Sequence, residues 1–143
     1  MGLANLNLRD TSNSGAVLEV LHPIERTPLR TDDGGAVTIT LLSKDSDAFI
    51  AADRAARARN VENMSEGAKW SPAEQDLLVT KTFVACTVGW SGVPQGWIDG
   101  TDTEAPAEFN PANALKLYEN PGMRWLREQV DKFISTRANF AKA

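Results

Sequence analysis

Ser91 lies in the sequence setting that comes nearest to that of a catalytic nucleophile. In Gly89-Trp90-Ser91-Gly92 the serine stands between glycines, whereas the nucleophile elbow requires G-x-S-x-G at a strand-to-helix turn. Here the second glycine comes one place early, and a helix is expected before the motif. His22, the only histidine, lies beside Pro23 in a segment with β character, so the sequence pairs no base with the serine. We interpret the motif as a turn that closes a helix.

The acidic run of residues 99–104 has the composition of a calcium loop but lacks its pattern. An EF-hand loop beginning at Asp99 needs glycine at its sixth position and glutamate at its twelfth. Those positions hold Glu104 and Asn110, so a solvated acidic loop is favoured over a weak cation site. One histidine and one cysteine leave few ligands for zinc. We predict no metal, no cofactor and no catalytic residues, and hence a protein that is not an enzyme.

Charge argues against nucleic acid as a partner. The chain has 15 basic and 19 acidic residues and a net charge of −4. Its basic cluster is expected on a helix, where Arg54 and Arg57 share a face and Asp53 is spaced to pair with Arg57. This spacing favours a solvated, internally paired helix face over a nucleic-acid contact. Cys86 lies among apolar neighbours, and we expect a buried thiol rather than a nucleophile.

No membrane contact is expected either. No run of residues approaches the roughly 18 apolar positions that a membrane span requires. The first residues lack the basic and apolar regions of a signal peptide. These features predict a cytoplasmic protein.

A chain of 143 residues corresponds to one domain. Residues 1–15 are predicted to form a flexible N-terminal arm, followed by a single α+β domain over residues 16–143. Its β unit covers residues 16–43 and its helical part covers residues 44–143. The expected fold is a small N-terminal antiparallel β-hairpin unit packed on a mainly α-helical domain of about four helices.

The strands and helices follow from local patterns. Residues 16–21 and 37–42 are predicted strands, and Val37, Ile39 and Leu41 would share one face. Capping residues precede the helices: Asp45 or Ser46, then Ser71-Pro72-Ala73-Glu74, Asn110-Pro111 and Asn120-Pro121. The predicted helices cover residues 45–64, 72–88, 111–118 and 121–138. Gly89 is expected to end the second of these helices. Residues 89–109 are expected to form an irregular stretch, and its length is typical of a functional or mobile segment.

Two of the four tryptophans, Trp90 and Trp97, flank this Gly- and Pro-rich stretch. Burial in the core is the commoner fate of such rings. An aromatic anchor for a partner protein is the alternative, because indole rings give a large contact area at low entropic cost.

The order of signals after residue 71 resembles that of the tail assembly chaperones of long-tailed bacteriophages. The matching features are the apolar helix leading into 88–93, then 109–114 with Tyr118 following, 125–130, and 137–140 at the end. The segment 41–46, which precedes an Ala- and Arg-rich helix, is also similar to these phage proteins. The resemblance covers about half of the chain closely and most of it loosely.

The resemblance implies a non-enzymatic role in the host cell cytoplasm. Proteins of this family bind the tape measure protein during tail assembly, help to bring tail tube subunits onto it, and are absent from the mature virion. The family likeness and the aromatic content together predict partner-binding residues, namely Trp90, Trp97, Phe109, Tyr118, Trp125 and Phe140. A homo-oligomer is left open. Two other functions also stay open: a structural head–tail or tail component of the virion, and a small phage inhibitor of a host protein.

Overall fold

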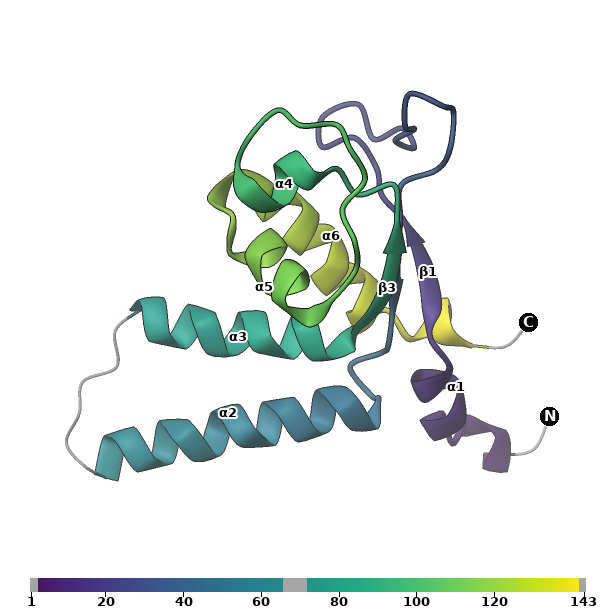
Figure 1. Ribbon diagram of the computed structural model, residues 1–143. Helices are drawn as coiled ribbons and strands as arrows, with labels where there is room; N and C mark the ends of the chain where they lie inside the picture. The colour runs from purple at the N-terminus through teal and green to yellow at the C-terminus, as the bar shows by residue number, and fades with distance from the viewer. Residues whose placement is uncertain (1–2, 66–71, 142–143) are drawn as a thin grey trace.

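The computed structural model describes residues 3–65 and 72–141 and shows a mixed α+β fold (Figure 1). Within these ranges, helices pack on one side of a three-stranded antiparallel sheet, which confirms the predicted fold class. The described part contains six α-helices, two more than the sequence predicts, because α1 and α4 are short helices in segments expected to be irregular.

The sheet consists of β1 (Ala16–Glu19), β2 (Thr38–Leu41) and β3 (Thr87–Ser91), in that spatial order. Leu18 lies opposite Ile39, and Ile39 lies opposite Trp90. Val37, Ile39 and Leu41 are all buried, as their alternation with polar or exposed positions predicts. The sheet therefore has one face in the core, whereas Val17 and Val88 remain exposed.

The third strand corrects the sequence prediction, which extended the preceding helix to Val88 and ended it at Gly89. In the structure α3 (Pro72–Cys86) ends at Cys86, and the next five residues form β3, which pairs with β2. A short apolar run is compatible with either a helix or a strand. Thr87 and Val88 are β-branched, and pairing with β2 decides between the two states.

The helices α2 (Asp47–Ser65) and α3 lie side by side as a hairpin that projects from the body of the molecule (Figure 1). Ser46 begins α2, because its Oγ accepts a hydrogen bond from the backbone N–H of Phe49 at 3.2 Å. This confirms one of the two predicted caps. The predicted cap of α3, Ser71, lies outside the described residues.

The N-terminal segment, which the sequence predicts to be a flexible arm, contains two short helices. From Leu3 it forms a 3-10 helix, η1 (Leu3–Leu6), and then α1 (Arg9–Ser14). Asn13 Oδ1 accepts the backbone N–H of Asp47 at 2.8 Å, and the Arg9 guanidinium lies 3.0 Å from the carboxylate of Asp47. The first turn of α2 thus holds the segment through contacts that no local sequence pattern predicts.

The C-terminal half follows the predicted capping signals. Asn110 caps α5 (Pro111–Glu119) by accepting the N–H of Asn113 at 2.8 Å, and Asn120 caps a 3-10 turn, η2 (Pro121–Met123), that leads into α6 (Arg124–Ser135). A last 3-10 turn, η3 (Arg137–Phe140), replaces the predicted final turn of this helix. Between β3 and α5 lies a short helix, α4 (Gln95–Asp99).

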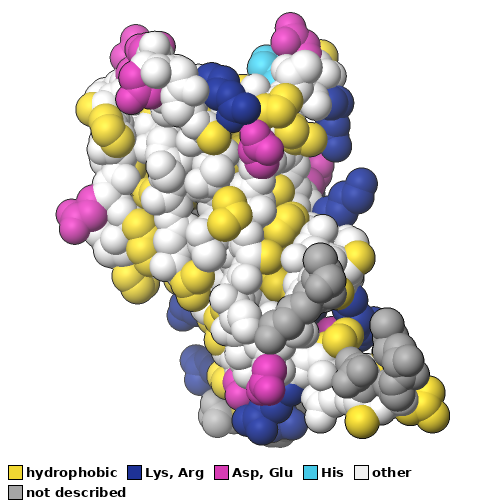
Figure 2. Space-filling view, turned by 90° about the vertical axis from the view of Figure 1, so that its right-hand side faces the viewer, with side chains coloured by type: hydrophobic (Ala, Val, Ile, Leu, Met, Phe, Trp, Pro, Cys, Tyr) yellow, Lys and Arg dark blue, Asp and Glu magenta, His cyan; other side chains and the backbone are white. Residues whose placement is uncertain are grey.

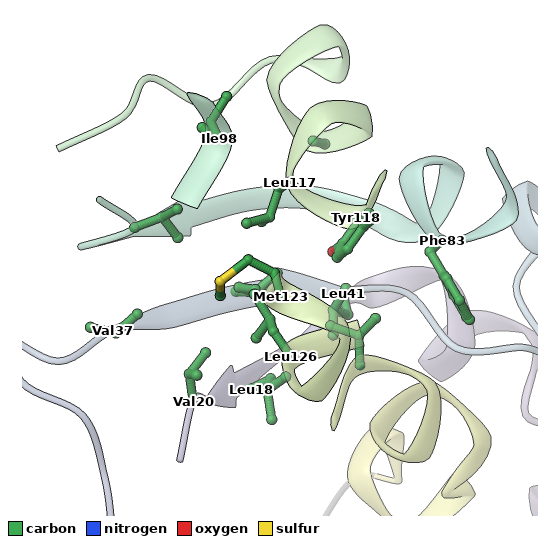
Figure 3. Packing of buried hydrophobic residues seen from close by; sticks show 14 of the residues in the cluster. Leu18, Val20, Val37, Leu41, Phe83, Ile98, Leu117, Tyr118, Met123 and Leu126 are labelled. Atoms are coloured by element: carbon green, nitrogen blue, oxygen red, sulfur yellow. The ribbon is translucent and has the colours of Figure 1, made fainter. Parts of the chain in front are cut away.

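The core forms where α5 and α6 meet the buried face of the sheet. Figure 3 shows Leu18 and Leu41 from the strands converging with Leu117 and Leu126 from the helices. Val130 and Ile134 follow Leu126 at four-residue spacing along α6 and are fully buried. Each such aliphatic side chain contributes roughly 1.5–3 kcal/mol of burial free energy.

Candidate binding groove

Four of the six predicted binding residues form two aromatic pairs. Trp90 lies edge-to-face against Phe109, with 5.0 Å between ring centroids, and Trp97 lies in the same way against Trp125 at 5.6 Å. The indole N–H of Trp90 donates to the carbonyl oxygen of Ala107 at 3.0 Å. All four side chains are half-buried against the core and keep part of their surface accessible.

The other two predicted residues are buried. Tyr118 is 2% exposed, and its hydroxyl shares a hydrogen bond of 2.7 Å with the Thr87 hydroxyl. Burial raises the pKa of Tyr118 above its ordinary value. Phe140 is 6% exposed and packs edge-to-face on Phe133. A role in binding stays a prediction for all six residues, but these two rings have little surface left for a partner.

A groove of about 430 Å³ lies between α3, the end of α5 and α6, and we call it the α3–α6 groove. Its apolar part comes from Val79, Phe83, Tyr118 and Pro121. Val79 is 48% exposed, although it lies on the same helix as buried Phe83. Charged residues of both signs make up most of the remaining lining: Asp76, Glu119, Arg124, Arg127, Glu128 and Asp131.

Arg127 connects the two sides of this groove. Its guanidinium carbon lies 5.4 Å from the centroid of the Phe83 ring, and a guanidinium nitrogen lies 3.0 Å from the carboxylate of Asp76. The Arg127 side chain is only 17% exposed. A guanidinium that stacks on a ring and pairs with a carboxylate is well ordered, so the floor of the groove is formed before any partner arrives.

Of the six binding residues predicted from the sequence, only Tyr118 lines the groove, and the α3 side was missed. Asp76, Val79 and Phe83 follow one another at spacings of three and four residues, which places them on one helix face. An acidic residue followed by two apolar ones on that face was the available signal. This signal was missed because α3 has apolar residues on more than one side, so no single face stands out as a binding surface.

The other candidate groups have structural roles. His22 Nδ1 accepts the backbone N–H groups of Ile24 and Glu25, each at 3.1 Å, and so closes a turn. Cys86 is fully buried, and burial raises the pKa of its thiol to about 11. Asp53 and Arg57 form the predicted ion pair at 3.0 Å.

The predicted acidic loop carries a local hydrogen bond. The Thr101 hydroxyl donates to Asp99 at 2.7 Å and thereby lowers the pKa of that carboxyl. Among residues 3–65 and 72–141, no three His, Cys, Asp or Glu side chains are grouped so that they could hold a metal ion. Over the same ranges, no helix combines the length and the apolar character needed to cross a bilayer.

Comparison of the chain with protein-family models, with curated proteins and with solved structures found no match.

Proposed function

We propose that this protein is a tail assembly chaperone of a long-tailed bacteriophage, which binds the tape measure protein in the host cell cytoplasm and is absent from the mature virion. It performs no catalysis, and it binds neither nucleic acid nor membranes. The tail tube protein is a second candidate partner. The proposal rests on the ordered sequence resemblance in the region after residue 71 and on the α3–α6 groove.

The groove is the observation that carries the proposal. A chaperone for a long helical client needs accessible apolar surface that a helix can enter. Val79 gives such a surface, with Phe83 and Tyr118 beneath it, and the groove lies on both C-terminal helices. Ionic side chains of both signs line it, and these can pair with the polar flanks of an amphipathic helix.

The position of the groove also suits a long partner. Its α3 side belongs to the hairpin that projects beyond α5 (Figure 1). A helix seated between α3 and α6 could therefore extend along the hairpin. We place the client helix on this surface, with an apolar residue of the client against Val79.

Co-expression with the tape measure protein of the same phage tests the proposal. We expect a soluble complex with the wild-type chain and loss of most of that complex with Val79→Glu, because a carboxylate would be desolvated against the client. The matched control is Val88→Glu on β3: Val88 is 49% exposed, close to the 48% of Val79, but lies outside the groove. Both variants should keep the wild-type circular dichroism spectrum.

Three results would contradict parts of the proposal. An insoluble tape measure protein with no recoverable complex would exclude the chaperone role. Detection of the chain by mass spectrometry of purified virions would favour a structural component. Copurification of a host protein from infected cells, without the tape measure protein, would favour an inhibitor.

A further inference from the structure

A second pocket, which we call the loop pocket, lies between residues 29–37 and residues 91–106 and has a volume of about 640 Å³. This volume is within the range of small-molecule binding sites. Its apolar lining comes from Leu29, Val37, Pro94, Trp97 and Pro106. No lining residue is shared with the α3–α6 groove.

The 91–106 wall of the loop pocket is fixed by close backbone packing. The N–H of Gln95 donates to the carbonyl of Ala105 at 2.7 Å. Gly92 has a φ of +77°, and a Cβ there would lie 3.0 Å from the carbonyl oxygen of Ala36, on the opposite wall. The two walls are thus in contact at this position, and little conformational entropy is left to lose on binding.

The opposite wall is a closed turn. The N–H of Thr31 donates to the carbonyl of Gly35, and the N–H of Gly34 donates to the carbonyl of Thr31, both at 2.8 Å. Asp33 accepts hydrogen bonds from the Thr31 hydroxyl and from the N–H of Gly35. These bonds hold the pKa of Asp33 below its ordinary value, so the carboxylate is ionised at neutral pH.

The charge of the loop pocket is one-sided. Its lining contains three carboxylates, those of Asp32, Asp33 and Glu104. Arg30 is the one cation among the described lining residues, and its guanidinium pairs with Glu19 at 3.1 Å. A lining that combines apolar side chains and an indole with three carboxylates is complementary to a cation that has a flat, weakly hydrated face.

We propose that the loop pocket binds an arginine side chain presented by an extended segment of a partner protein. A guanidinium can stack on an indole and donate two parallel hydrogen bonds to a carboxylate, which the point charge of lysine cannot do. The cavity also has room for apolar neighbours of that arginine against the two prolines. This inference rests on the loop pocket and is independent of the tape measure protein.

Titration with short capped peptides tests the inference directly. The probe is acetyl-Leu-Arg-Leu-amide, with the lysine and glutamine analogues as comparisons, and the readout is the two-dimensional ¹H–¹⁵N NMR spectrum of the full chain. The arginine peptide should shift the indole N–H signal of Trp97 and the amide signals of residues 31–35 at millimolar concentration. The lysine peptide should bind more weakly, and the glutamine peptide should cause no shift.

Two double variants of equal charge change separate the loop pocket from general acidity. Asp32→Asn with Glu104→Gln removes two rim carboxylates, whereas Asp102→Asn with Glu108→Gln removes two exposed carboxylates outside the lining. We expect the first pair to weaken arginine-peptide binding by about three- to tenfold and the second by less than about twofold. Exposed positions tolerate these changes, so both variants should fold.

The inference is overturned by any of four outcomes. Two of them concern the arginine peptide: no shift of any NMR signal, or shifts only of signals from the α3–α6 groove. The third is equally strong binding of the lysine or glutamine analogue. The fourth is an equal loss of arginine-peptide affinity in the two double variants. The peptide comparison on the wild-type chain decides the matter even if a variant does not fold.

Discussion

The α2–α3 hairpin and the segment 92–107 are held in place by different kinds of contact. The hairpin is regular helix, and α2 packs chiefly against α3 and touches α1. The segment 92–107 contains one short helix, yet its backbone donates hydrogen bonds at Gln95, Gly96 and Ala107 to residues across the loop. The irregular 92–107 segment is therefore held by more cross-loop contacts than the regular helix α2.

Surface composition reinforces this contrast. Figure 2 shows hydrophobic side chains reaching one face of the molecule in separate patches among charges of both signs. On the hairpin, Ile50 and Val79 are exposed, whereas Val93 and Ile98 in the segment are buried. Because α2 packs chiefly against α3, it should open locally at a lower free energy than the cross-linked 92–107 segment.

The largest expected change in the free energy of unfolding is for a core residue, and it can be compared with the change for a residue on the hairpin. Leu126→Ala on α6 removes a fully buried side chain and should lower the free energy of unfolding by about 3 kcal/mol. Ile50→Ala on α2 removes a side chain that is 38% exposed and should change it by less than about 1 kcal/mol. Urea unfolding measures both. Equal losses would mean that the hairpin is as deeply packed as α6.

Alanine substitutions at two glycines test how tightly the 92–107 segment is packed. A Cβ at Gly96 would lie 2.5 Å from the carbonyl oxygen of Thr101 and 2.9 Å from that of Thr103. Because backbone cannot move aside cheaply, Gly96→Ala should cost about 2 kcal/mol. At Gly89 a Cβ would meet nothing within 4 Å, so Gly89→Ala is the matched control and should have an effect near zero. A tolerated Gly96→Ala would show that the segment is looser than its contacts indicate.

The sequence predicted those features that local chemistry determines. Asn110 and Asn120 cap helices because their side chains reach backbone N–H groups two or three residues ahead. Val37, Ile39 and Leu41 are buried because alternation along a strand needs no partner to be recognised. Cys86 was expected in the core from its apolar neighbours and is there.

The sequence did not predict features that depend on distant residues. β3 is a strand because β2, nearly fifty residues earlier, pairs with it. Leu21 has both backbone groups bonded to the side-chain amide of Gln129, at 3.0 and 2.8 Å, across 108 residues. The α3–α6 groove likewise requires Asp76 and Arg127 to meet from separate helices. Such pairings have no local signature, so only Tyr118 among the residues of this groove was predicted from the sequence.

The pH dependence of stability at alkaline pH tests the packing at the base of the hairpin. Ser46 begins α2 there, and Cys86 ends α3. Burial raises the pKa of Cys86 from 9.0 to about 11, so the unfolded chain loses this proton first. The contribution to stability is therefore present below pH 9 and is lost as pH rises to about 11. The loss should be on the order of 2–3 kcal/mol.

The free energy of unfolding measured against pH for wild type and Cys86→Ala isolates this contribution. Cys86→Ala should start from a lower stability because of the cavity, but fall less steeply above pH 9. Tyr118 has a pKa shifted in the same direction, chiefly by burial, and this burial is kept in both proteins. Parallel curves would mean that the thiol is accessible to water at the base of the hairpin.

The smallest effects distinguish two ion pairs with the same distance of 3.0 Å. Asp53–Arg57 lies along α2, with the Arg57 side chain 79% exposed, whereas Asp76–Arg127 joins the hairpin to α6, with Arg127 17% exposed on the Phe83 ring. Double-mutant cycles with alanine should give a coupling of about 1 kcal/mol for Asp76–Arg127 and about 0.3 kcal/mol for Asp53–Arg57. Added salt should reduce the second coupling more than the first, because water and ions screen exposed charges better. If the two couplings are equal, Arg127 does not hold the hairpin to the body of the molecule, and the floor of the α3–α6 groove is not preformed.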